Sequence, residues 1–314
     1  MTRRFGPGLV LAALSALLVG LSSGAVAPAA APLVPPSGSK LVRAELDLVP
    51  DARTRPHVVL MTLGGPIYCI QLANLARALD ASRLCADYGR NGYEGAGGRG
   101  ARKEDWGDPT YLAAVAQLPA RLRRSGVKVS KLVLVGVSYS GFANAELVAT
   151  HPELGPDALI VIDSYLDLPA RYSALPPQHE TRKEIESVIG GTLAQLPEAY
   201  ATRSPSHHLA GLAEAIRHGM RFIHIWSVIP EEKKEFKGAT CSQAANAEWL
   251  TELAGLLGRP VTGYVTQMRH AHALWDRGRE ALALAGIGSG TRVFAARPVL
   301  FSSGAPVPPD SYCG

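Results

Sequence analysis

The chain has 314 residues, of which 47% are hydrophobic and 19% are charged. This length and composition exclude a short peptide scaffold and an intrinsically disordered chain, and they allow one large folded domain or two smaller ones. The formal net charge is +5, but Arg3 and Arg4 lie in a segment that we expect to be removed, so about +3 remains, dispersed along the chain. We therefore expect no nucleic-acid partner.

The N-terminus has the pattern of a secretory signal peptide. The two arginines precede an apolar run over residues 9–21, and small residues follow it. We expect residues 1–29 to be a leader, with cleavage between about residues 25 and 31, and the mature protein to be secreted or to lie in the cell envelope. A retained signal anchor is the alternative, although the run is shorter than a spanning helix needs. No later stretch is long enough to span a bilayer, so no stable membrane span is expected after processing.

Four cysteines remain in the mature chain, Cys69, Cys85, Cys241 and Cys313. Thiols tend to pair outside the cytoplasm, so two disulfides are expected, and three connectivities are possible. We favour Cys69 with Cys85 because they are close in the sequence, and Cys241 with Cys313, which would pin the C-terminal tail. The cysteine spacings match no metal-binding motif. Four buried free thiols are the alternative.

Beyond residue 37, apolar runs typical of strands alternate with segments of helical period. Predicted strands cover 41–48, 57–63, 83–88, 131–137, 158–162, 222–227 and 261–266, and predicted helices cover 68–79, 109–124, 143–150, 244–257 and 275–285. Strands separated by helical crossovers favour an α/β fold over residues 38–290, with a mostly parallel sheet flanked by helices. Residues 165–220 are longer than one crossover needs and predict a small helical cap. Residues 291–314 carry four prolines and predict an irregular tail.

The most informative segment is a buried strand that runs into a turn and then a helix, with the sequence LVLVGVSYSGFA from Leu132 to Ala143. A serine held at such a turn needs small neighbours two positions away on each side, and Gly136 and Ser140 occupy these positions around Ser138. Because Gly141 comes next, the motif is G-x-S-x-S-G rather than G-x-S-x-G. An incidental serine between a strand and a helix is the simpler alternative.

This segment resembles the nucleophile elbow of the α/β-hydrolase superfamily, and the resemblance covers residues 41–285. The run HVVLMTLGGP from residue 57 to 66 is similar to the strand and Gly-rich loop that donates an oxyanion-hole amide in this family. Its Gly-Gly-Pro resembles proline iminopeptidase-like members, although Leu63 stands where those peptidases have histidine. The resemblance implies that the N–H groups of Gly65 and Tyr139 stabilise an oxyanion. The alternative is that Gly64 and Gly65 only permit a tight turn.

The general base in this family follows the last strand. Two histidines, His270 and His272, come after the predicted strand at 261–266, and the run HALWD from His272 resembles the family pattern G-H-x-x-W. The resemblance favours His272 as the base that accepts the proton of Ser138, with His270 as the alternative. Three of the other histidines, His207, His208 and His224, are interpreted as cap or core residues, and His224 is expected to be hydrogen-bonded within its strand.

A carboxylate must orient the imidazole and must come between Ser138 and the histidine in the chain. The loop after the predicted strand 222–227 is its usual place in the family, but the first acidic residues there are Glu231 and Glu232. Asp163 ends the preceding strand, a position that some members use, and a buried carboxylate needs a partner. Asp163 is therefore the favoured acid, with Glu231, Glu232 or Glu235 as alternatives. Alternatively, Asp163 has a structural role and makes a hydrogen bond that anchors the cap.

These residues predict a secreted serine hydrolase, similar to esterases and lipases, that cleaves an ester by a triad of Ser138, His272 and Asp163 through an acyl-enzyme. The expected partner is a small acyl substrate, and no metal or organic cofactor is implied. A serine exopeptidase or acyltransferase with the same triad, and a non-catalytic hydrolase-like binding protein, are the alternatives. The oligomeric state is left open. Candidate lining residues of the pocket are Tyr68, Tyr165 and Tyr172.

Overall fold

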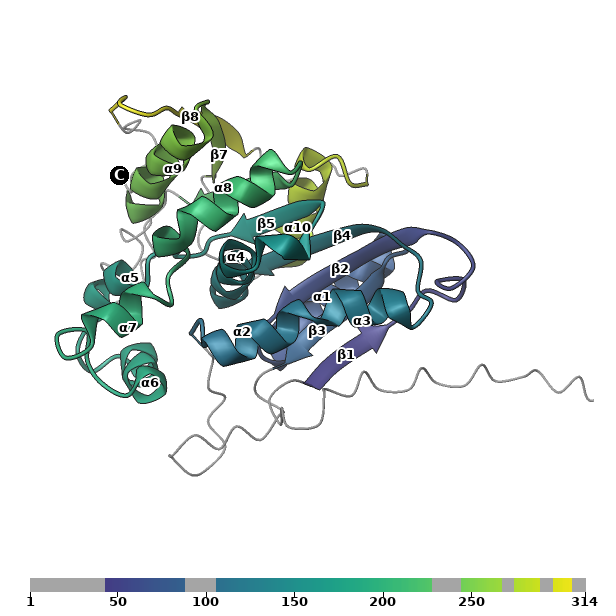
Figure 1. The fold of residues 1–314 in the computed structure, drawn as a ribbon, viewed down its shortest axis with the longest axis horizontal. Coiled ribbons are helices and arrows are strands. Elements are labelled where there is room, and N and C mark those ends of the chain that lie inside the picture. Colours follow the sequence, from purple (N-terminus) through teal and green to yellow (C-terminus); the bar gives the residue numbers. More distant parts are fainter. Residues whose placement is uncertain (1–42, 88–105, 228–243, 267–273, 289–295, 307–314) are drawn as a thin grey trace, which may run out of the picture. The chain divides into compact units, whose positions relative to one another are not determined.

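The fold is built on a mostly parallel β-sheet with helices on both faces, which confirms the predicted fold class (Figure 1). The computed structural model describes residues 43–87, 106–227, 244–266, 274–288 and 296–306, and these lie in one compact unit. Among them, no helix combines the length and the apolar character that crossing a bilayer requires.

Eight strands of the described chain form the sheet in the order β1-β3-β2-β4-β5-β6-β7-β8. The six inner strands run parallel to one another, and the edge strands β1 and β8 are antiparallel to their neighbours. The strands are β1 (Arg43–Asp47), β2 (His57–Leu63), β3 (Ser82–Asp87), β4 (Val129–Val137), β5 (Ala158–Ile162), β6 (Arg221–Ser227), β7 (Val261–Thr266) and β8 (Arg297–Phe301). All five residues of β5 are buried, because helices cover both faces of a parallel sheet.

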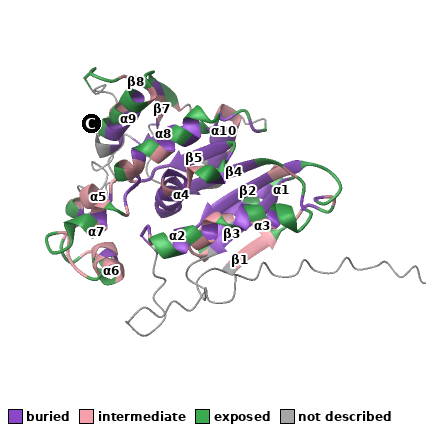
Figure 2. Cartoon of the chain, viewed as in Figure 1, coloured by how far each residue is buried: buried purple, intermediate pink, exposed green. Residues whose placement is uncertain are grey.

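Two helical layers enclose the sheet, and Figure 2 shows its central strands buried between them. Side chains alternate along each strand, so on β4 the core of one face receives Leu132 and Leu134 while the core of the other receives Val133 and Val135. The first face packs against α2 (Pro109–Ala116), α3 (Leu118–Arg124), α4 (Tyr139–Thr150), α8 (Leu209–Arg217) and α9 (Ala244–Leu257). The second face packs against α1 (Pro66–Ala78) and α10 (Leu274–Leu284).

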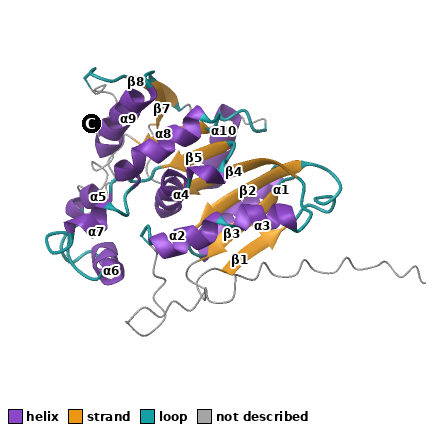
Figure 3. Ribbon diagram, viewed as in Figure 1, coloured by secondary structure: helices purple, strands orange, loops and turns teal. Residues whose placement is uncertain are grey.

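Two elements differ from the sequence prediction (Figure 3). The helix predicted over 109–124 is divided into α2 and α3 at Gln117, because Pro119 in the first turn of α3 has no N–H to continue the α2 ladder. The prediction of an irregular tail was wrong over Arg297–Phe301, where β8 pairs with β7. Pro298 is tolerated there because an edge strand donates hydrogen bonds on one side only.

The connection between β5 and β6 contains four α-helices, of which only the last belongs to the layers that cover the sheet. A Cβ atom on Gly211 of α8 would lie 1.9 Å from the carbonyl oxygen of Ala149 in α4, so the two helices are in close contact. The inserted part is therefore α5 (Leu168–Ala174), α6 (Glu180–Ile189) and α7 (Pro197–Ala201), which is shorter than the predicted cap of residues 165–220.

Aromatic and polar contacts hold these three helices together. The Tyr172 hydroxyl of α5 donates to Glu186 of α6, and the rings of Tyr172 and Tyr200 meet edge to face at 5.0 Å. The guanidinium of Arg182 lies 4.1 Å from the centroid of the Tyr172 ring. Tyr172 is only 3% exposed and fills the interior of the inserted helices, in contrast to its predicted role as a pocket-lining residue.

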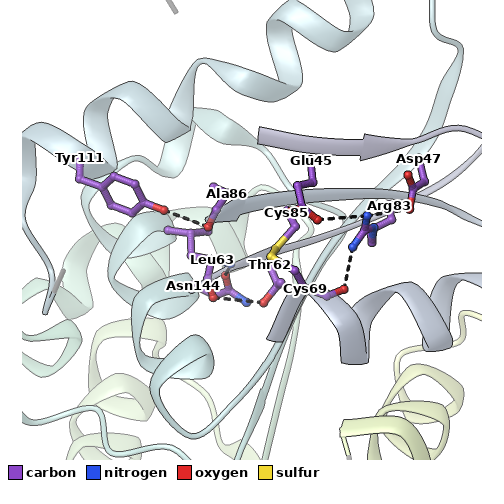
Figure 4. Close-up of a disulfide and its surroundings, with 10 residues drawn as sticks. All are labelled: Glu45, Asp47, Thr62, Leu63, Cys69, Arg83, Cys85, Ala86, Tyr111 and Asn144. Atoms are coloured by element: carbon purple, nitrogen blue, oxygen red, sulfur yellow. Dashed lines mark hydrogen bonds and ion pairs between the residues drawn. A yellow bond between two sulfur atoms is a disulfide. The ribbon is translucent and has the colours of Figure 1, made fainter. Parts of the chain in front are cut away.

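A disulfide joins Cys69 of α1 to Cys85 of β3, as the sequence predicts (Figure 4). Beside it, Arg83 donates to the Cys69 carbonyl at 2.8 Å and pairs with Asp47 at 2.7 Å and Glu45 at 3.3 Å. The disulfide thus fixes α1 to the sheet, and α1 starts at the predicted oxyanion loop. The other predicted pair, Cys241 with Cys313, lies outside the described residues.

Removing this disulfide by the double substitution Cys69→Ala and Cys85→Ala should lower the free energy of unfolding by about 3 kcal/mol, because the bond closes a loop of the chain in the unfolded state. The two cysteines are 16 positions apart. Urea unfolding followed by circular dichroism measures the change. An unfolding free energy equal to that of the unreduced wild type would contradict a stabilising bond at this site.

Candidate active site

The predicted nucleophile and the favoured acid follow neighbouring strands at the same edge of the sheet. Ser138 comes directly after β4 and Asp163 directly after β5, whose last residues, Val137 and Ile162, are paired in register. The Ser138 N–H donates to the Ile162 carbonyl at 2.8 Å, and the Asp163 N–H donates to the Ile225 carbonyl of β6 at 2.8 Å. The two residues are therefore fixed to the sheet by their own backbones.

The turn at Ser138 is strained. Its backbone has φ of +53° and ψ of −126°, a region that residues with a Cβ rarely adopt. The close packing of the turn requires glycine nearby, because a Cβ on Gly136 would lie 2.5 Å from the carbonyl carbon and oxygen of Ser140. A strained serine where glycine would be less costly is typical of a residue kept for its side chain.

Ser138 is the only residue between Leu132 and Ala149 that is not buried. It is the N-cap of α4, yet its hydroxyl caps none of the amides in the described helix. The turn therefore exposes the hydroxyl of Ser138, while the strand residues before it and the helix residues after it are buried. This is the arrangement that a nucleophile needs.

Ser140 has a different role. Its hydroxyl donates to the carbonyl oxygen of Val137 at 2.9 Å and accepts from the N–H of the same residue at 2.8 Å. Both bonds are buried and tie the first turn of α4 back to the end of β4. Ser140 is thus a structural part of the turn, which explains why a serine replaces the second glycine of the motif.

The predicted oxyanion loop follows β2, the neighbour of β4 in the sheet. The Leu63 N–H donates to the side-chain oxygen of Asn144 in α4 at 3.0 Å (Figure 4). The Gly64 N–H donates to the Ala86 carbonyl at 3.1 Å. Within the described part of the chain, the N–H of Gly65 donates to no acceptor. Gly64 has φ of +130°, and a Cβ there would lie 2.6 Å from the Tyr68 ring.

Both predicted oxyanion donors lie at helix N-termini. Gly65 is the N-cap of α1, and Tyr139 is the first residue of α4. The first amides of a helix have no acceptor within the helix, and the helix dipole places partial positive charge there. These ends can therefore stabilise negative charge on a ligand.

Asp163 is completely buried and has φ of +47°. Its Oδ1 atom accepts from the N–H of Ser227 at 2.7 Å, so the carboxylate reaches the end of β6. In the family that the sequence resembles, this is the strand whose following loop usually carries the acid. The alternatives Glu231, Glu232 and Glu235 lie outside the described residues.

Aromatic rings surround the first turn of α4. Tyr139 packs against Tyr68 at 6.1 Å between ring centroids and against Trp106, edge to face, at 5.2 Å. Trp106 also contacts Phe142 at 5.9 Å. Sequence reasoning selected Tyr68 but missed Trp106, since a single tryptophan before α2 carries no pattern that links it to the first turn of α4, which comes much later in the chain. The third predicted lining residue, Tyr165, is half-buried under the guanidinium of Arg171, which lies 3.9 Å from its ring centroid.

The predicted base candidates, His270 and His272, lie outside the described residues. Among the other histidines, His208 lies 3.5 Å from Glu146 and 3.1 Å from the Thr202 carbonyl, and His207 is exposed. Both lie within the predicted cap of residues 165–220, but after the inserted helices α5, α6 and α7.

His224 is a core residue, but the expectation that it is hydrogen-bonded was wrong. Neither ring nitrogen has a hydrogen-bond partner within the described chain. Its ring stacks on Trp249 at 5.5 Å and meets Trp226 at 4.8 Å. Complete burial lowers the pKa of His224 to about 3, so the ring is neutral at ordinary pH.

Comparison with known proteins finds similarity in structure. No family model matches the sequence, and no curated protein matches it. A puromycin hydrolase has a TM-score of 0.54 and 15% identity, over 79% of this chain and 38% of its own. An acylaminoacyl peptidase in complex with Z-Gly-Gly-Phe-chloromethyl ketone has a TM-score of 0.51 and 13% identity, over 78% and 38%. An esterase from the bacterial hormone-sensitive lipase family has a TM-score of 0.47 and 18% identity, over 78% and 79%.

The chain thus spans 38% of the length of the first two structures that it matches. At 13% and 15% identity, these likenesses establish the fold.

Proposed function

Because the chain has the α/β-hydrolase fold, we propose that it is a serine hydrolase that cleaves a carboxylic ester through an acyl-enzyme. The observation that carries this proposal is the strained and accessible Ser138, at a turn whose other residues are buried. The same edge of the sheet holds the buried carboxylate of Asp163. A nucleophile and an acid on neighbouring strands are two parts of a catalytic triad.

In the proposed mechanism, the Ser138 Oγ attacks the carbonyl carbon of the ester while the imidazole of His272 accepts its proton. Asp163 orients the imidazole and stabilises the cation that forms. The carbonyl oxygen becomes an oxyanion that accepts hydrogen bonds from the N–H groups of Gly65 and Tyr139. The imidazolium then protonates the leaving alcohol, which leaves Ser138 acylated.

Water completes the cycle. His272 takes a proton from the water as the water oxygen attacks the acyl carbon, and it returns that proton to Ser138 when the acyl bond breaks. The carboxylic acid and the free enzyme are the products.

The proposed place of action is outside the cytoplasm. The pattern of the leader supports secretion, and so does the disulfide between Cys69 and Cys85, since disulfides persist in oxidising compartments. The leader itself, residues 1–29, lies outside the described chain.

A second candidate function is hydrolysis of an aminoacyl amide or peptide. One observation favours it, namely that a puromycin hydrolase and an acylaminoacyl peptidase are among the structural matches with a TM-score above 0.5. Leu63, at the position where similar peptidases have histidine, favours the ester instead. Comparing turnover of short-chain p-nitrophenyl esters with that of aminoacyl p-nitroanilides separates the two functions.

A fluorophosphonate probe tests the proposed nucleophile. We expect the probe to modify the folded wild type once, at Ser138, and to leave Ser138→Ala unmodified. Ser140→Ala is the matched control, because it removes a neighbouring hydroxyl that bonds only Val137 within the described chain, and we expect it to remain reactive. Intact-protein mass spectrometry measures the modification.

The absence of modification in folded wild type would overturn the enzyme proposal and would favour the non-catalytic binding protein. Modification of Ser138→Ala at another serine would instead show that the nucleophile is misassigned. Circular dichroism of each sample establishes that the protein tested is folded.

A further inference from the structure

We propose that Ser164, a residue with no place in the triad, positions the oxyanion-hole amide of Tyr139. This inference rests on the proposed function and deepens it. Ser164 follows Asp163 at the end of β5 and is completely buried. Its hydroxyl donates to the carbonyl oxygen of Ser138 at 2.5 Å, so it holds the backbone of the nucleophile rather than its side chain.

The first turn of α4 is shaped around this hydroxyl. A Cβ on Gly141 would lie 2.0 Å from the Ser164 Oγ, so only glycine leaves room for it. The Ile162 carbonyl is a second, longer contact of the same hydroxyl, at 3.2 Å. A hydroxyl has one hydrogen to donate, and the shorter contact assigns it to Ser138.

The geometry of the peptide bond transmits this contact to the oxyanion site. The Ser138 carbonyl and the Tyr139 N–H belong to one planar trans peptide, and in such a peptide the two groups point in opposite directions. Holding the carbonyl against Ser164 therefore aims the Tyr139 N–H away from α4, toward the space beyond its N-terminus. An oxyanion donor acts only when its N–H points at the oxygen that becomes charged.

Ser164 is itself fixed by Asn246 of α9. The side-chain amide of Asn246 donates to the Ser164 carbonyl at 2.8 Å. Its oxygen accepts from the N–H of Leu166 at 3.3 Å and from the indole N–H of Trp249 at 3.1 Å. Asn246 is completely buried, and both ends of its amide are used, so a rigid chain of contacts runs from α9 through Ser164 to the candidate active site.

Loss of the Ser164 hydroxyl should change the direction of the Tyr139 N–H but leave the fold intact. The Ser138 carbonyl keeps two other donors, the N–H groups of Gly141 at 3.1 Å and Phe142 at 3.2 Å, which belong to α4 itself. The helix therefore still forms in Ser164→Ala. Without the bond from Ser164, the first turn of α4 loses a tie to the end of β5, so the direction of the Tyr139 N–H relative to the oxyanion site is less well fixed.

The test compares Ser164→Ala with the wild type and with Ser82→Ala. Ser82 is an equally buried serine at the start of β3, on the side of the sheet where the parallel strands begin, whereas Ser164 lies where they end. The Ser82 hydroxyl accepts from the Val49 N–H at 3.1 Å and bonds His57 at 2.7 Å. Turnover of a p-nitrophenyl ester gives kcat and KM. Titration with the fluorophosphonate counts reactive molecules, so that kcat refers to folded enzyme only. The inhibition constant of a trifluoromethyl ketone, which forms a tetrahedral adduct with an oxyanion, reports on the oxyanion site.

In Ser164→Ala, we expect kcat to fall by about 10- to 100-fold, less than removal of an oxyanion donor costs, with KM within about twofold of wild type. The inhibition constant should rise by the same factor as kcat/KM falls. In Ser82→Ala, the thermal midpoint should fall while kcat stays unchanged.

Three results would overturn the inference: an unchanged kcat in Ser164→Ala, a fall in kcat with no change in the inhibition constant, or an equal fall in kcat in Ser82→Ala. If instead the proposed function itself is wrong, the folded wild type will not react with the fluorophosphonate at all, and this outcome is distinct from the three above.

Discussion

Asp163→Asn should lower kcat for an ester substrate by about 10⁴-fold, the loss typical of a triad aspartate replaced by its amide. Asparagine keeps a side-chain oxygen that can accept from the Ser227 N–H, at the place where Oδ1 now lies 2.7 Å away, so the backbone turn is preserved. What disappears is the negative charge that orients the imidazole and stabilises its protonated form. The effect should therefore fall on kcat rather than on folding.

Steady-state kinetics measures this loss, and matched variants test its assignment. Glu231→Gln and Glu232→Gln change the alternative acids in the same way, and we expect both to retain turnover close to wild type. A full loss in one of these variants, with Asp163→Asn within tenfold of wild type, would move the acid to the residues that follow β6 in the sequence and leave Asp163 with a structural role.

The second large effect is on stability, and it arises at His224. Its pKa is about 3 in the folded protein, against an ordinary value of about 6.5 in the unfolded chain. Between these values the unfolded state binds the additional proton, so the free energy of unfolding decreases as the pH falls from about 6.5 toward 3. The slope is about 1.4 kcal/mol per pH unit, which gives a loss of about 3 kcal/mol at pH 4.5 and about 4 kcal/mol at pH 3.

His224→Leu removes this titration and should flatten the pH dependence by that amount. The substitution also removes two buried ring nitrogens that have no hydrogen-bond partner within the described chain, so stability at pH 7 should be equal or greater. Urea unfolding at pH 7 and at pH 4.5 measures both effects.

His57→Leu is a useful contrast, because His57 is buried but bonds Ser82 at 2.7 Å. Its replacement leaves the Ser82 hydroxyl without this partner and should lower stability already at pH 7. If wild type and His224→Leu lose the same free energy between pH 7 and 4.5, the burial of a neutral ring at this position does not control acid stability.

The regular part of the fold could be predicted from the sequence because its signals are local. Apolar runs bounded by turn residues placed β2, β5 and β7 with the bounds that the structure has. The elbow could be predicted for the same reason, since Gly136, Ser138 and Gly141 lie within one short segment. The disulfide followed from the proximity of its two cysteines in the chain.

Features that depend on contacts between distant segments could not be predicted in this way. Asn246 lies 82 positions from Ser164, and only the packing of α9 brings its amide to that carbonyl. The sequence places Asp163 at the end of a strand, but its bond to Ser227 depends on the pairing of β5 with β6. The lack of hydrogen-bond partners at His224 could not be predicted, because alternation in a strand indicates which face a side chain occupies and not which groups it meets there.

The two antiparallel edge strands have a further consequence, for aggregation. An open sheet edge can template strands from other molecules and so start an intermolecular sheet. On β8, Pro298 has no N–H to offer such a strand, and Arg297 beside it adds charge. On β1, only five residues are available, and the charged residues among them include Glu45 and Asp47. Both edge strands are therefore poor templates, which protects the sheet from self-association through its edges.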